Sequence, residues 1–565
     1  MIIEIEVNGR KIKTQKGELI LDTLNANGIH VPTLCNLEGF KPSGACRICV
    51  VEVEGRNDLV PSCSFYVEEW MKIKTHSARV IQARKTILEL LLSNHEDGCL
   101  FCDRGRWCKL QDLASELNVT ERKYDTRTTR KKIDNTSQAI IRDPAKCILC
   151  SRCVRICEEL QMVAALDFLN RGSRTEVGTV LDKGLNYTSC ISCGQCIQVC
   201  PTGALKEKSH VDQVSRLLLD KEKISVALID PVLFVTLGEF YNYKPGRESS
   251  SIFINALRRT GFQKVYETDW GMEFLAGKVV DLVLDNNPGE GSHPLLLSEC
   301  PSFVKYITQS RPDLLSSLVP LKPARQSMAS MIREMISQRT GKPLSDINIV
   351  YLTSCTASKN ETIAALKIKD AKYLPDFALT TREVYRLIRL FGIQIESLSP
   401  ESQEDVISPG AKLGHLSAIS GGFVEMLARI IRARYPDAKV TGEKLGKIRG
   451  PKDVKETVCE VRNRKITMAS FSSIAQFEGY SKEMKSKQHK FDVVEVMACQ
   501  HGCINGGGQP CRGSDRNLRN RLKGVLDWDE KYSGIQTREK LELPSSVTLT
   551  GEDWSAAFAP RLIIK

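Results

Sequence analysis

The first part of the chain has the alternation of apolar and polar residues that is typical of β-strands. Residues 2–7 read IIEIEV and residues 11–14 read KIKT, with Asn8 and Gly9 between them. A period of two places one face of a strand on a core, and an Asn-Gly pair is typical of a tight hairpin turn. The pattern therefore predicts two paired strands at the start of the chain.

From about residue 222 onward, short apolar runs alternate with helical patterns. The runs are ISVALI, INIVYL and FDVVEVM, at residues 224–229, 347–352 and 491–497. Residues 251–261 and 382–392 have apolar positions at helical spacing, and each ends in a glycine. Strands that are apolar throughout are buried on both faces, and their alternation with helices is typical of parallel sheets. We expect a two-lobed α/β region with buried parallel strands.

Residues 120–140 are polar and lack a helical apolar stripe, so the pattern predicts a linker. Six of the twelve residues from 121 to 132 are basic. A run of this kind is typical of a solvated connection, and docking of an acidic electron carrier is the alternative.

Composition makes the cysteines the outstanding feature of this chain. Of its 565 residues, 42% are hydrophobic and 26% are charged, which indicates several packed domains, yet 21 are cysteines. The N-terminus lacks a signal-peptide core, and no apolar run approaches the ~20 residues of a membrane span. We therefore expect thiolate metal ligands in a reducing cytoplasm, and neither a secreted disulfide scaffold nor a membrane span.

The formal net charge of +12 does not by itself indicate a nucleic-acid partner. That charge counts every cysteine as neutral, whereas a cluster held by four thiolates carries a charge of roughly −2. Several such clusters would cancel most of the basic excess. We expect no nucleic acid.

The first cysteine group has the spacing C-x10-C-x2-C-x13-C, with Gly39 and Gly44 in the turns between its members. The group comprises Cys35, Cys46, Cys49 and Cys63. A close pair with two flanking cysteines suits a [2Fe–2S] centre wrapped by a loop. A zinc knuckle or unliganded thiols are the alternatives. The segment resembles the plant-type ferredoxin-like start of the large iron–sulfur subunit of respiratory NADH dehydrogenases.

The second group places a histidine and three cysteines within fourteen residues. Its members are His95, Cys99, Cys102 and Cys108. The spacing alone suits either zinc or a [4Fe–4S] cluster. Its position directly behind the first group resembles the same NADH-dehydrogenase and hydrogenase module, and that resemblance implies a [4Fe–4S] cluster.

The third block repeats C-x2-C-x2-C-x3-C twice, and Pro201 follows the second copy. The two runs are Cys147, Cys150, Cys153, Cys157 and Cys190, Cys193, Cys196, Cys200. This is the bacterial two-cluster ferredoxin pattern, in which the fourth cysteine of each run ligates the other cluster. We therefore expect Cys200 to complete the first [4Fe–4S] cluster and Cys157 the second.

Three apolar runs of the C-terminal half are followed directly by cysteine-bearing loops. These loops contain Cys300, Cys355, and the pair Cys499 and Cys503. Ligands of open α/β folds gather at the carboxyl ends of strands, so the loops are expected to converge. Four thiolates from three loops would suit a further [4Fe–4S] site. The glycines at 506–508 would let the backbone pass close to a bulky cofactor.

The string from Glu495 to Pro510, ExMACxxGCxxGGGQP, resembles the third signature of [FeFe]-hydrogenases. The Cys300 and Cys355 loops resemble altered versions of the first and second signatures, and Met497 matches the third. The resemblance implies an H-cluster, with a [4Fe–4S] unit bound by these four cysteines and Cys503 bridging to a di-iron unit that carries CO and cyanide. Such a cofactor makes or splits hydrogen, and the N-terminal clusters would connect it to a redox partner.

The departures from the family lie beside this chemistry. Glu299 stands where the first signature has the cysteine that passes protons, so the resemblance implies a glutamate relay. Ser358 stands where the second signature has a cyanide-binding lysine, and Lys359, one residue later, would substitute only if the loop shifts. Residues 323–326 read PARQ in place of SPQQ, and residues 278–282 lack two glutamates that lead protons to the surface.

Two functions fit this pattern. One is a hydrogenase with altered cofactor surroundings, and the other is a redox sensor or an electron-transfer subunit of an NADH-linked complex. No dinucleotide-binding fingerprint is present, so the expected partners are ferredoxin or flavin- and NAD(P)-binding subunits in a hetero-oligomer. The expected fold is α+β and multidomain. It comprises a β-grasp [2Fe–2S] domain at residues 1–78 and a segment with one histidine and three cysteine ligands at 79–119. A two-cluster ferredoxin domain follows at 137–209, and the hydrogenase-like α/β region at 222–565.

Overall fold

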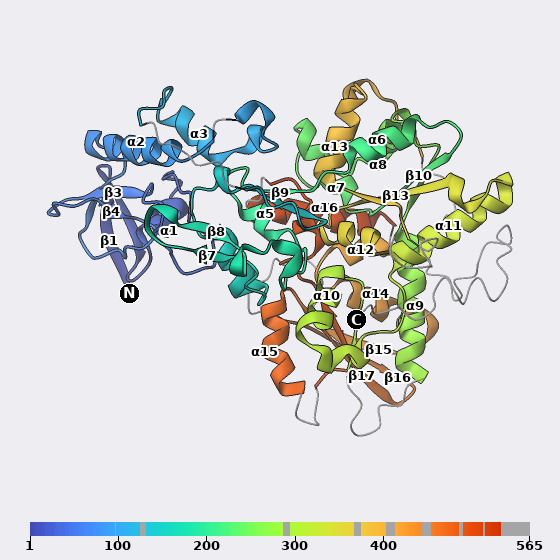
Figure 1. The fold of residues 1–565 in the computed structure, drawn as a ribbon. Coiled ribbons are helices and arrows are strands. Elements are labelled where there is room, and N and C mark those ends of the chain that lie inside the picture. Colours follow the sequence, from blue (N-terminus) through green and yellow to red (C-terminus); the bar gives the residue numbers. More distant parts are fainter. Residues whose placement is uncertain are drawn as a thin grey trace.

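The computed structural model places three cysteine-rich N-terminal modules beside a larger C-terminal region (Figure 1). It describes residues 1–96, 98–124, 132–285, 294–365, 374–402, 413–442, 454–484, 490–511 and 515–532. The N-terminal sheet lies at one end of the molecule, and the module that carries β7, β8 and α5 lies between that sheet and the C-terminal region.

The N-terminal module is a five-stranded sheet in the order β2-β1-β5-β3-β4. Its strands are β1 (Ile2–Val7), β2 (Arg10–Gln15), β3 (Val50–Val53), β4 (Val60–Pro61) and β5 (Lys72–Lys74). The predicted hairpin is confirmed, because β1 and β2 pair antiparallel around Asn8 and Gly9, which both have positive φ. Helices α1 (Ile20–Ala26) and α2 (Ala78–Ser93) accompany the sheet.

The middle modules are held by short elements around their cysteines. These are α3 (Lys109–Glu116), α4 (Arg152–Arg155), α5 (Gln195–Val199) and two ribbons, β6 (Ile140–Arg142) with β9 (Leu205–Glu207) and β7 (Asp167–Leu169) with β8 (Glu176–Gly178). The predicted linker was wrong for its last part. Asp134 and Ala139 are buried, and Asp134 pairs with Arg142, so these residues belong to the ferredoxin-like module. Residues 125–131 of the predicted linker lie outside the described residues.

The C-terminal region begins with a four-stranded, fully parallel sheet in the order β11-β10-β13-β14. Its strands are β10 (Ile224–Ile229), β11 (Lys264–Glu267), β13 (Ile347–Thr353) and β14 (Phe377–Thr380). Its helices include α6 (Val211–Leu219), α8 (Ser250–Arg259), α9 (Asp269–Asp285), α11 (Ala324–Thr340), α12 (Ala357–Ala365) and α13 (Thr381–Leu390). The predicted strands and helices of this part are confirmed.

The second sheet, in the order β12-β18-β17-β16-β15, is mixed. Its strands are β12 (Leu295–Leu296), β15 (Lys439–Gly442), β16 (Lys455–Val461), β17 (Arg464–Phe471) and β18 (Val493–Val496). Strands β15 to β17 pair antiparallel, which differs from the expected parallel lobe. A tight turn at Arg462 and Asn463, both with positive φ, explains the β16–β17 hairpin. Helices α10 (Pro301–Ser310), α14 (Gly422–Arg434), α15 (Ile474–Met484) and α16 (Asp515–Tyr532) complete the region.

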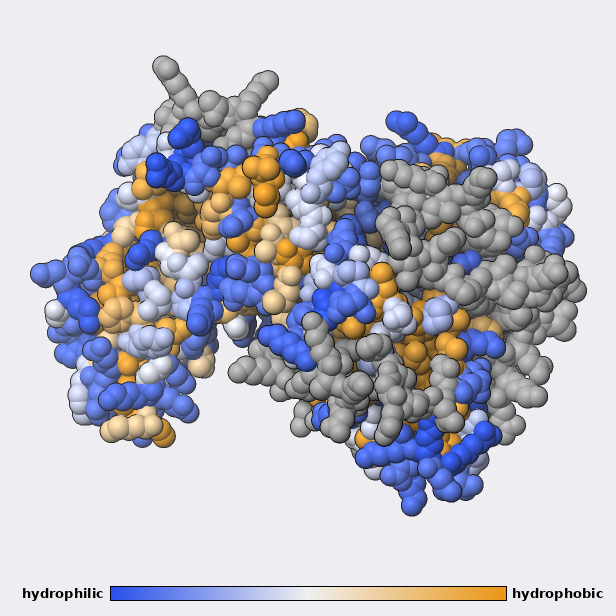
Figure 2. Space-filling view, turned by 60° about the horizontal axis from the view of Figure 1, so that its bottom comes forward, coloured by the Kyte–Doolittle hydropathy of each residue, from blue (hydrophilic) through white to orange (hydrophobic). Residues whose placement is uncertain are grey.

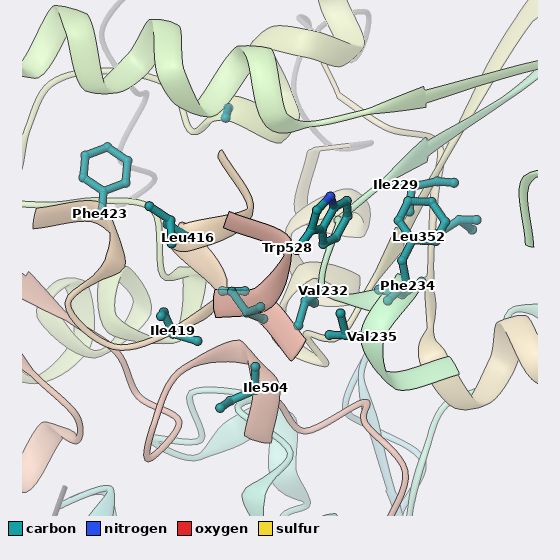
Figure 3. Packing of buried hydrophobic residues seen from close by; sticks show 14 of the residues in the cluster. Ile229, Val232, Phe234, Val235, Leu352, Leu416, Ile419, Phe423, Ile504 and Trp528 are labelled. Atoms are coloured by element: carbon teal, nitrogen blue, oxygen red, sulfur yellow. The ribbon is translucent and has the colours of Figure 1, made fainter. Parts of the chain in front are cut away.

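One apolar core joins the two sheets. It contains Ile229 and Leu352 of the parallel sheet together with Met468 and Val493 of the mixed sheet. Figure 3 shows Phe423, Leu416 and Ile419 on one side of this core and Ile504, beside the third cysteine loop, below them. Because the strand ends of both sheets share a core, their loops are held close together.

Among the described residues, no helix has the length and apolarity needed to cross a membrane. Apolar side chains nevertheless reach the surface in several places in the half of the molecule that holds the N-terminal modules (Figure 2). Leu100 and Phe101, between two cysteines of the second group, are 89% and 85% exposed.

Candidate cofactor site

Four cysteines from three loops line one cavity. Cys300 follows β12 and precedes α10, and Cys355 lies between β13 and α12. Cys499 and Cys503 follow β18. The expected convergence of the loops is therefore found, because strand ends of two sheets meet at this cavity.

The four thiols suit a metal cluster better than an unliganded site. Burial raises the pKa of all four, to about 11 for Cys355, so free side chains here are neutral thiols. A thiolate at this depth needs a cation to hold it, and iron supplies that charge. The donor set and the cavity thus fit an iron–sulfur cofactor.

The loop after Cys503 runs in close contact with neighbouring backbone. A Cβ on Gly506 would lie 2.5 Å from the carbonyl oxygen of Ser354, and one on Gly507 would lie 2.2 Å from that of Cys193. A Cβ on Gly508 would meet Thr380 at 2.7 Å. These glycines therefore let the loop approach protein backbone, and Gly506 also lines the cavity beside which the sequence predicts a cofactor.

The carboxylate of Glu299 lies at the cavity but is tied to its neighbours. Its Oε1 accepts a hydrogen bond from the backbone N–H of Ala324 at 2.8 Å, and Arg325 Nη1 lies 3.3 Å from Oε2. Arg325 also donates from Nε to Glu361 at 2.8 Å. Burial alone would lower the pKa of Arg325, but Glu361 and Glu299 raise it above its ordinary value. Arg325 is therefore the electrostatic partner of Glu299.

Asp230 is a cavity residue that the sequence reasoning missed. It follows β10 directly, and its Oδ1 accepts a hydrogen bond from the Val232 N–H at 3.3 Å. Burial raises the pKa of Asp230 to about 6, although Arg325 acts in the opposite direction. Its place at the carboxyl end of a buried strand is the signal that would have identified it.

Ser358 lines the cavity and Lys359 does not. The Ser358 hydroxyl lies within hydrogen-bonding reach of the Cys355 sulfur. Lys359 Nζ instead lies 2.9 Å from Glu383 and 3.1 Å from the carbonyl oxygen of Ala378, and both charged side chains are fully buried. Lys359 would have to break this ion pair to reach the cavity.

The ferredoxin-like module pairs its cysteines across the two runs. Three cysteines of the first run line a cavity together with the last cysteine of the second, namely Cys147, Cys150, Cys153 and Cys200. Burial raises the pKa of Cys157 to about 11, and the nearby Cys190 raises it further. This placement agrees with the exchange of the fourth cysteine that the motif predicts.

The remaining two groups also come together. His95, Cys99, Cys102 and Cys108 line a cavity that Gly203 of the ferredoxin-like module also lines. A Cβ on Gly203 would lie 2.5 Å from the Cys102 sulfur. In the N-terminal module, the Cys35 thiol is within hydrogen-bonding reach of Cys46 and Cys63, and the Cys63 thiol within reach of Cys49.

Among the residues that the structure describes, no three His, Cys, Asp or Glu side chains converge tightly enough for a single metal ion. Cys459, in β16, is fully buried away from the cavity, and Cys511 accepts a hydrogen bond from Arg382 at 3.2 Å.

Comparison with known families assigns the C-terminal region. Residues 223–507 match the C-terminal domain of the iron only hydrogenase large subunit. The chain belongs to this family. Three further families match N-terminal segments. Residues 2–78 match a 2Fe-2S iron-sulfur cluster binding domain, and residues 84–123 match the NADH-ubiquinone oxidoreductase-G iron-sulfur binding region. Residues 137–206 match the ferredoxin-like domain of NADH-quinone oxidoreductase subunit 3.

Two relatives share nearly the whole length. The NADP-reducing hydrogenase subunit HndD of Solidesulfovibrio fructosivorans is 32% identical over 97% of this chain and 95% of its own. Iron hydrogenase 1 of Clostridium pasteurianum is 28% identical over 90% of this chain and 88% of its own. A variant of the [FeFe]-hydrogenase HydA1 from Chlamydomonas reinhardtii shares the fold of 63% of this chain and 98% of its own, with a TM-score of 0.53 and 21% identity.

This iron only hydrogenase homologue is an iron–sulfur oxidoreductase of the [FeFe]-hydrogenase type, and its N-terminal domains resemble those of NADH dehydrogenases. It is a mixed α/β multidomain protein with [2Fe–2S] and [4Fe–4S] ferredoxin-like domains in front of the hydrogenase domain.

Proposed function

We propose that this protein interconverts protons and hydrogen at an H-cluster held by Cys300, Cys355, Cys499 and Cys503. The observation that carries the proposal is the convergence of these four thiols on one cavity. When bound, the di-iron unit with its CO and cyanide ligands supplies the redox chemistry that joins two protons and two electrons. Cys503 is the proposed bridging ligand, and Met497 lines the same cavity.

The other four cysteine sets form the proposed electron relay. It consists of one [2Fe–2S] cluster, held by Cys35, Cys46, Cys49 and Cys63, and three [4Fe–4S] clusters. The ligands of the first [4Fe–4S] cluster are His95, Cys99, Cys102 and Cys108, and those of the second are Cys147, Cys150, Cys153 and Cys200. The ligands of the third are Cys157, Cys190, Cys193 and Cys196. The corresponding domains would be a β-grasp ferredoxin domain at 1–78, the segment with one histidine and three cysteine ligands at 79–119, a two-cluster ferredoxin domain at 137–209 and the hydrogenase domain at 222–565.

The proposed partners are ferredoxin or flavin- and NAD(P)-binding subunits of a cytoplasmic hetero-oligomer. The relative HndD is named a subunit of an NADP-reducing hydrogenase, which supports this choice. The exposed Leu100 and Phe101, next to the exposed Cys99, offer an apolar contact beside a proposed cluster.

Two carboxyl groups of this chain can hold protons at the cavity. Glu299 is the proposed proton relay, and it is ion-paired with Arg325. Asp230 lines the same cavity, and its pKa of about 6 allows it to exchange a proton near neutral pH. Ser358 is the proposed neutral hydrogen-bond donor to a cyanide ligand.

The proposal is tested with protein that is purified anaerobically and loaded with the di-iron unit. We expect CO and cyanide infrared bands and hydrogen evolution with a reduced dye. Cys355→Ala should abolish both, whereas Cys459→Ala, a buried thiol outside the cavity, should abolish neither. Bands without turnover in the unaltered protein would contradict hydrogen catalysis.

A redox sensor or electron-transfer subunit is the second candidate function. The contacts of Glu299 favour it, because a carboxylate tied to Arg325 and to the Ala324 N–H is less free to move between a proton donor and a proton acceptor. This candidate predicts infrared bands with negligible turnover. Glu299→Cys separates the two functions, since a large gain in hydrogen evolution would show that the present loop is tuned away from fast catalysis.

A further inference from the structure

Three glutamine side chains of the ferredoxin-like module reach the loop that carries Cys499 and Cys503. Gln161 Nε2 donates to the carbonyl oxygen of Ala498 at 2.8 Å, and Gln195 Nε2 donates to that of Asn505 at 2.8 Å. Gln198 Nε2 donates to the carbonyl oxygens of Gly506 and Gln509, at 2.9 and 2.8 Å. The module that would deliver electrons thus binds the backbone of the loop that would receive them.

Gln195 differs from the other two because its amide also lies beside a proposed cluster ligand. Burial raises the pKa of the Cys499 thiol, and the Gln195 side chain and the Gly507 N–H act in the opposite direction as hydrogen-bond donors. A carboxamide nitrogen carries two hydrogens, and the bond to Asn505 uses one of them. The second hydrogen is available to the Cys499 sulfur.

Gln195 also lies where the segments of two proposed clusters are in contact. It stands between Cys193 and Cys196 in the chain and is 3% exposed. A Cβ on Gly507 would lie 2.7 Å from the Cα of Gly194 and 2.2 Å from the oxygen of Cys193. The backbone that carries one cluster therefore touches the backbone that carries the other.

We propose that Gln195 sets the reduction potential of the terminal [4Fe–4S] cluster by donating an N–H···S hydrogen bond to Cys499. Hydrogen bonds to cluster sulfurs stabilise the more negative, reduced form and raise its reduction potential. In the transfer concerned, one electron leaves the cluster of Cys157, Cys190, Cys193 and Cys196, which is oxidised, and reduces the terminal cluster. The segment that holds the electron-donating cluster thereby raises the reduction potential of the electron-accepting cluster. This inference rests on the cluster sites of the proposed function.

The test is an anaerobic redox titration, followed by electron paramagnetic resonance, of the full-length protein without the di-iron unit. Gln195→Leu should shift the midpoint of the terminal cluster to a more negative potential and leave the other midpoints in place. Gln195→Met, which conserves the side-chain volume, should give the same shift and separates the lost hydrogen bond from a packing defect.

Gln198→Leu is the matched control, because it removes two hydrogen bonds between the same module and loop without touching a sulfur. An unchanged midpoint in Gln195→Leu would overturn the inference, and so would an equal shift in Gln198→Leu. An unaltered protein that shows no terminal-cluster signal would instead contradict the proposed function, so the two failures are distinguishable.

Discussion

Arg325 compensates the negative charges of two carboxylates at the edge of the cavity. It is 5% exposed and holds Glu299 on one side and Glu361 on the other. Neither carboxylate is stable at this depth without a cation, because desolvation of a charge costs several kcal/mol. The glutamate at residue 299 is thus stabilised by the arginine at residue 325.

The first prediction concerns this triad. Arg325→Gln should lower the free energy of unfolding by about 3–5 kcal/mol, since it removes the buried cation that both carboxylates contact. Urea unfolding of the cluster-loaded protein under argon measures the change.

Lys490→Gln is the control for this prediction. It removes an ion pair with Glu456 in which both side chains are largely exposed, and it should cost less than about 1 kcal/mol. Equal losses in the two variants would show that Arg325 contributes no more to stability than a surface lysine does.

At the scale of elements, the register of α12 decides which side chain faces the cavity. Successive residues of a helix are about 100° apart around its axis, so neighbours face different sides. Ser358 faces the cavity, and Lys359 reaches β14 and Glu383. A lysine displaced by one position is therefore no substitute for a cavity-facing lysine while α12 keeps this register.

The second prediction follows from that register. In protein that carries the di-iron unit, Ser358→Ala should shift the cyanide infrared bands, because it removes the hydroxyl that faces the cavity. Thr362→Ala, on the same helix, removes a buried hydroxyl that bonds to the Lys359 carbonyl, and it should leave the bands in place. Unshifted bands in Ser358→Ala would place the cyanide ligands elsewhere.

Helix α9 carries a buried carboxyl group that makes stability depend on pH. Burial raises the pKa of Glu273 to about 7, and its Oε1 accepts a hydrogen bond from the Leu413 N–H. The folded protein therefore binds this proton more tightly than the unfolded chain does. Its contribution to stability is complete below about pH 4.5 and is lost as the pH rises to about 7.

The third prediction is that Glu273→Gln removes this loss. The amide oxygen keeps the hydrogen bond to Leu413 and cannot ionise, so the variant should be more stable than the parent at pH 8, by up to about 3 kcal/mol. Near pH 4.5 the two should be equal. Urea unfolding at both pH values, followed by the fluorescence of the nearby Trp270, measures the difference. A gain of equal size at both pH values would contradict the assignment.

At the scale of the whole molecule, the contact between Gly194 and Gly507 joins the relay to the cofactor site. Buried charges support this contact, because Arg382 donates to the carbonyl oxygens of Gly507 and Gln509 at 2.7 Å and pairs with Glu207 of the ferredoxin-like module. Any side chain at residue 507 would push the two cluster-bearing segments apart.

The fourth prediction tests this contact. Gly507→Ala should destabilise the protein by about 1–3 kcal/mol through overpacking. It should also weaken the magnetic coupling between the two adjacent reduced clusters in electron paramagnetic resonance spectra.

Gly479→Ala is the control for the fourth prediction. Gly479 lies in α15 with nothing within 4 Å of its would-be Cβ. The variant should gain about 1 kcal/mol from helix propensity and keep the coupling. Unchanged coupling in Gly507→Ala would mean that the clusters do not communicate through this contact.

The sequence by itself determined the order of the modules, the cysteine groups and most strands and helices around them. Cluster ligands repeat within a few residues, and strand and helix periods are local, so both can be recognised without a fold. The exchange of Cys157 and Cys200 also follows from a motif of fixed spacing. The ligand roles and the domain boundaries remain predictions.

Only the tertiary structure decided how the residues beside the cavity are used. It paired Glu299 with Arg325, turned Lys359 toward Glu383, placed Asp230 in the cavity and brought Gln195 to Cys499. These partners lie on different elements, and several belong to different modules. Desolvation and ion pairing depend on what packs around a group in space, and local sequence spacing carries no record of that packing.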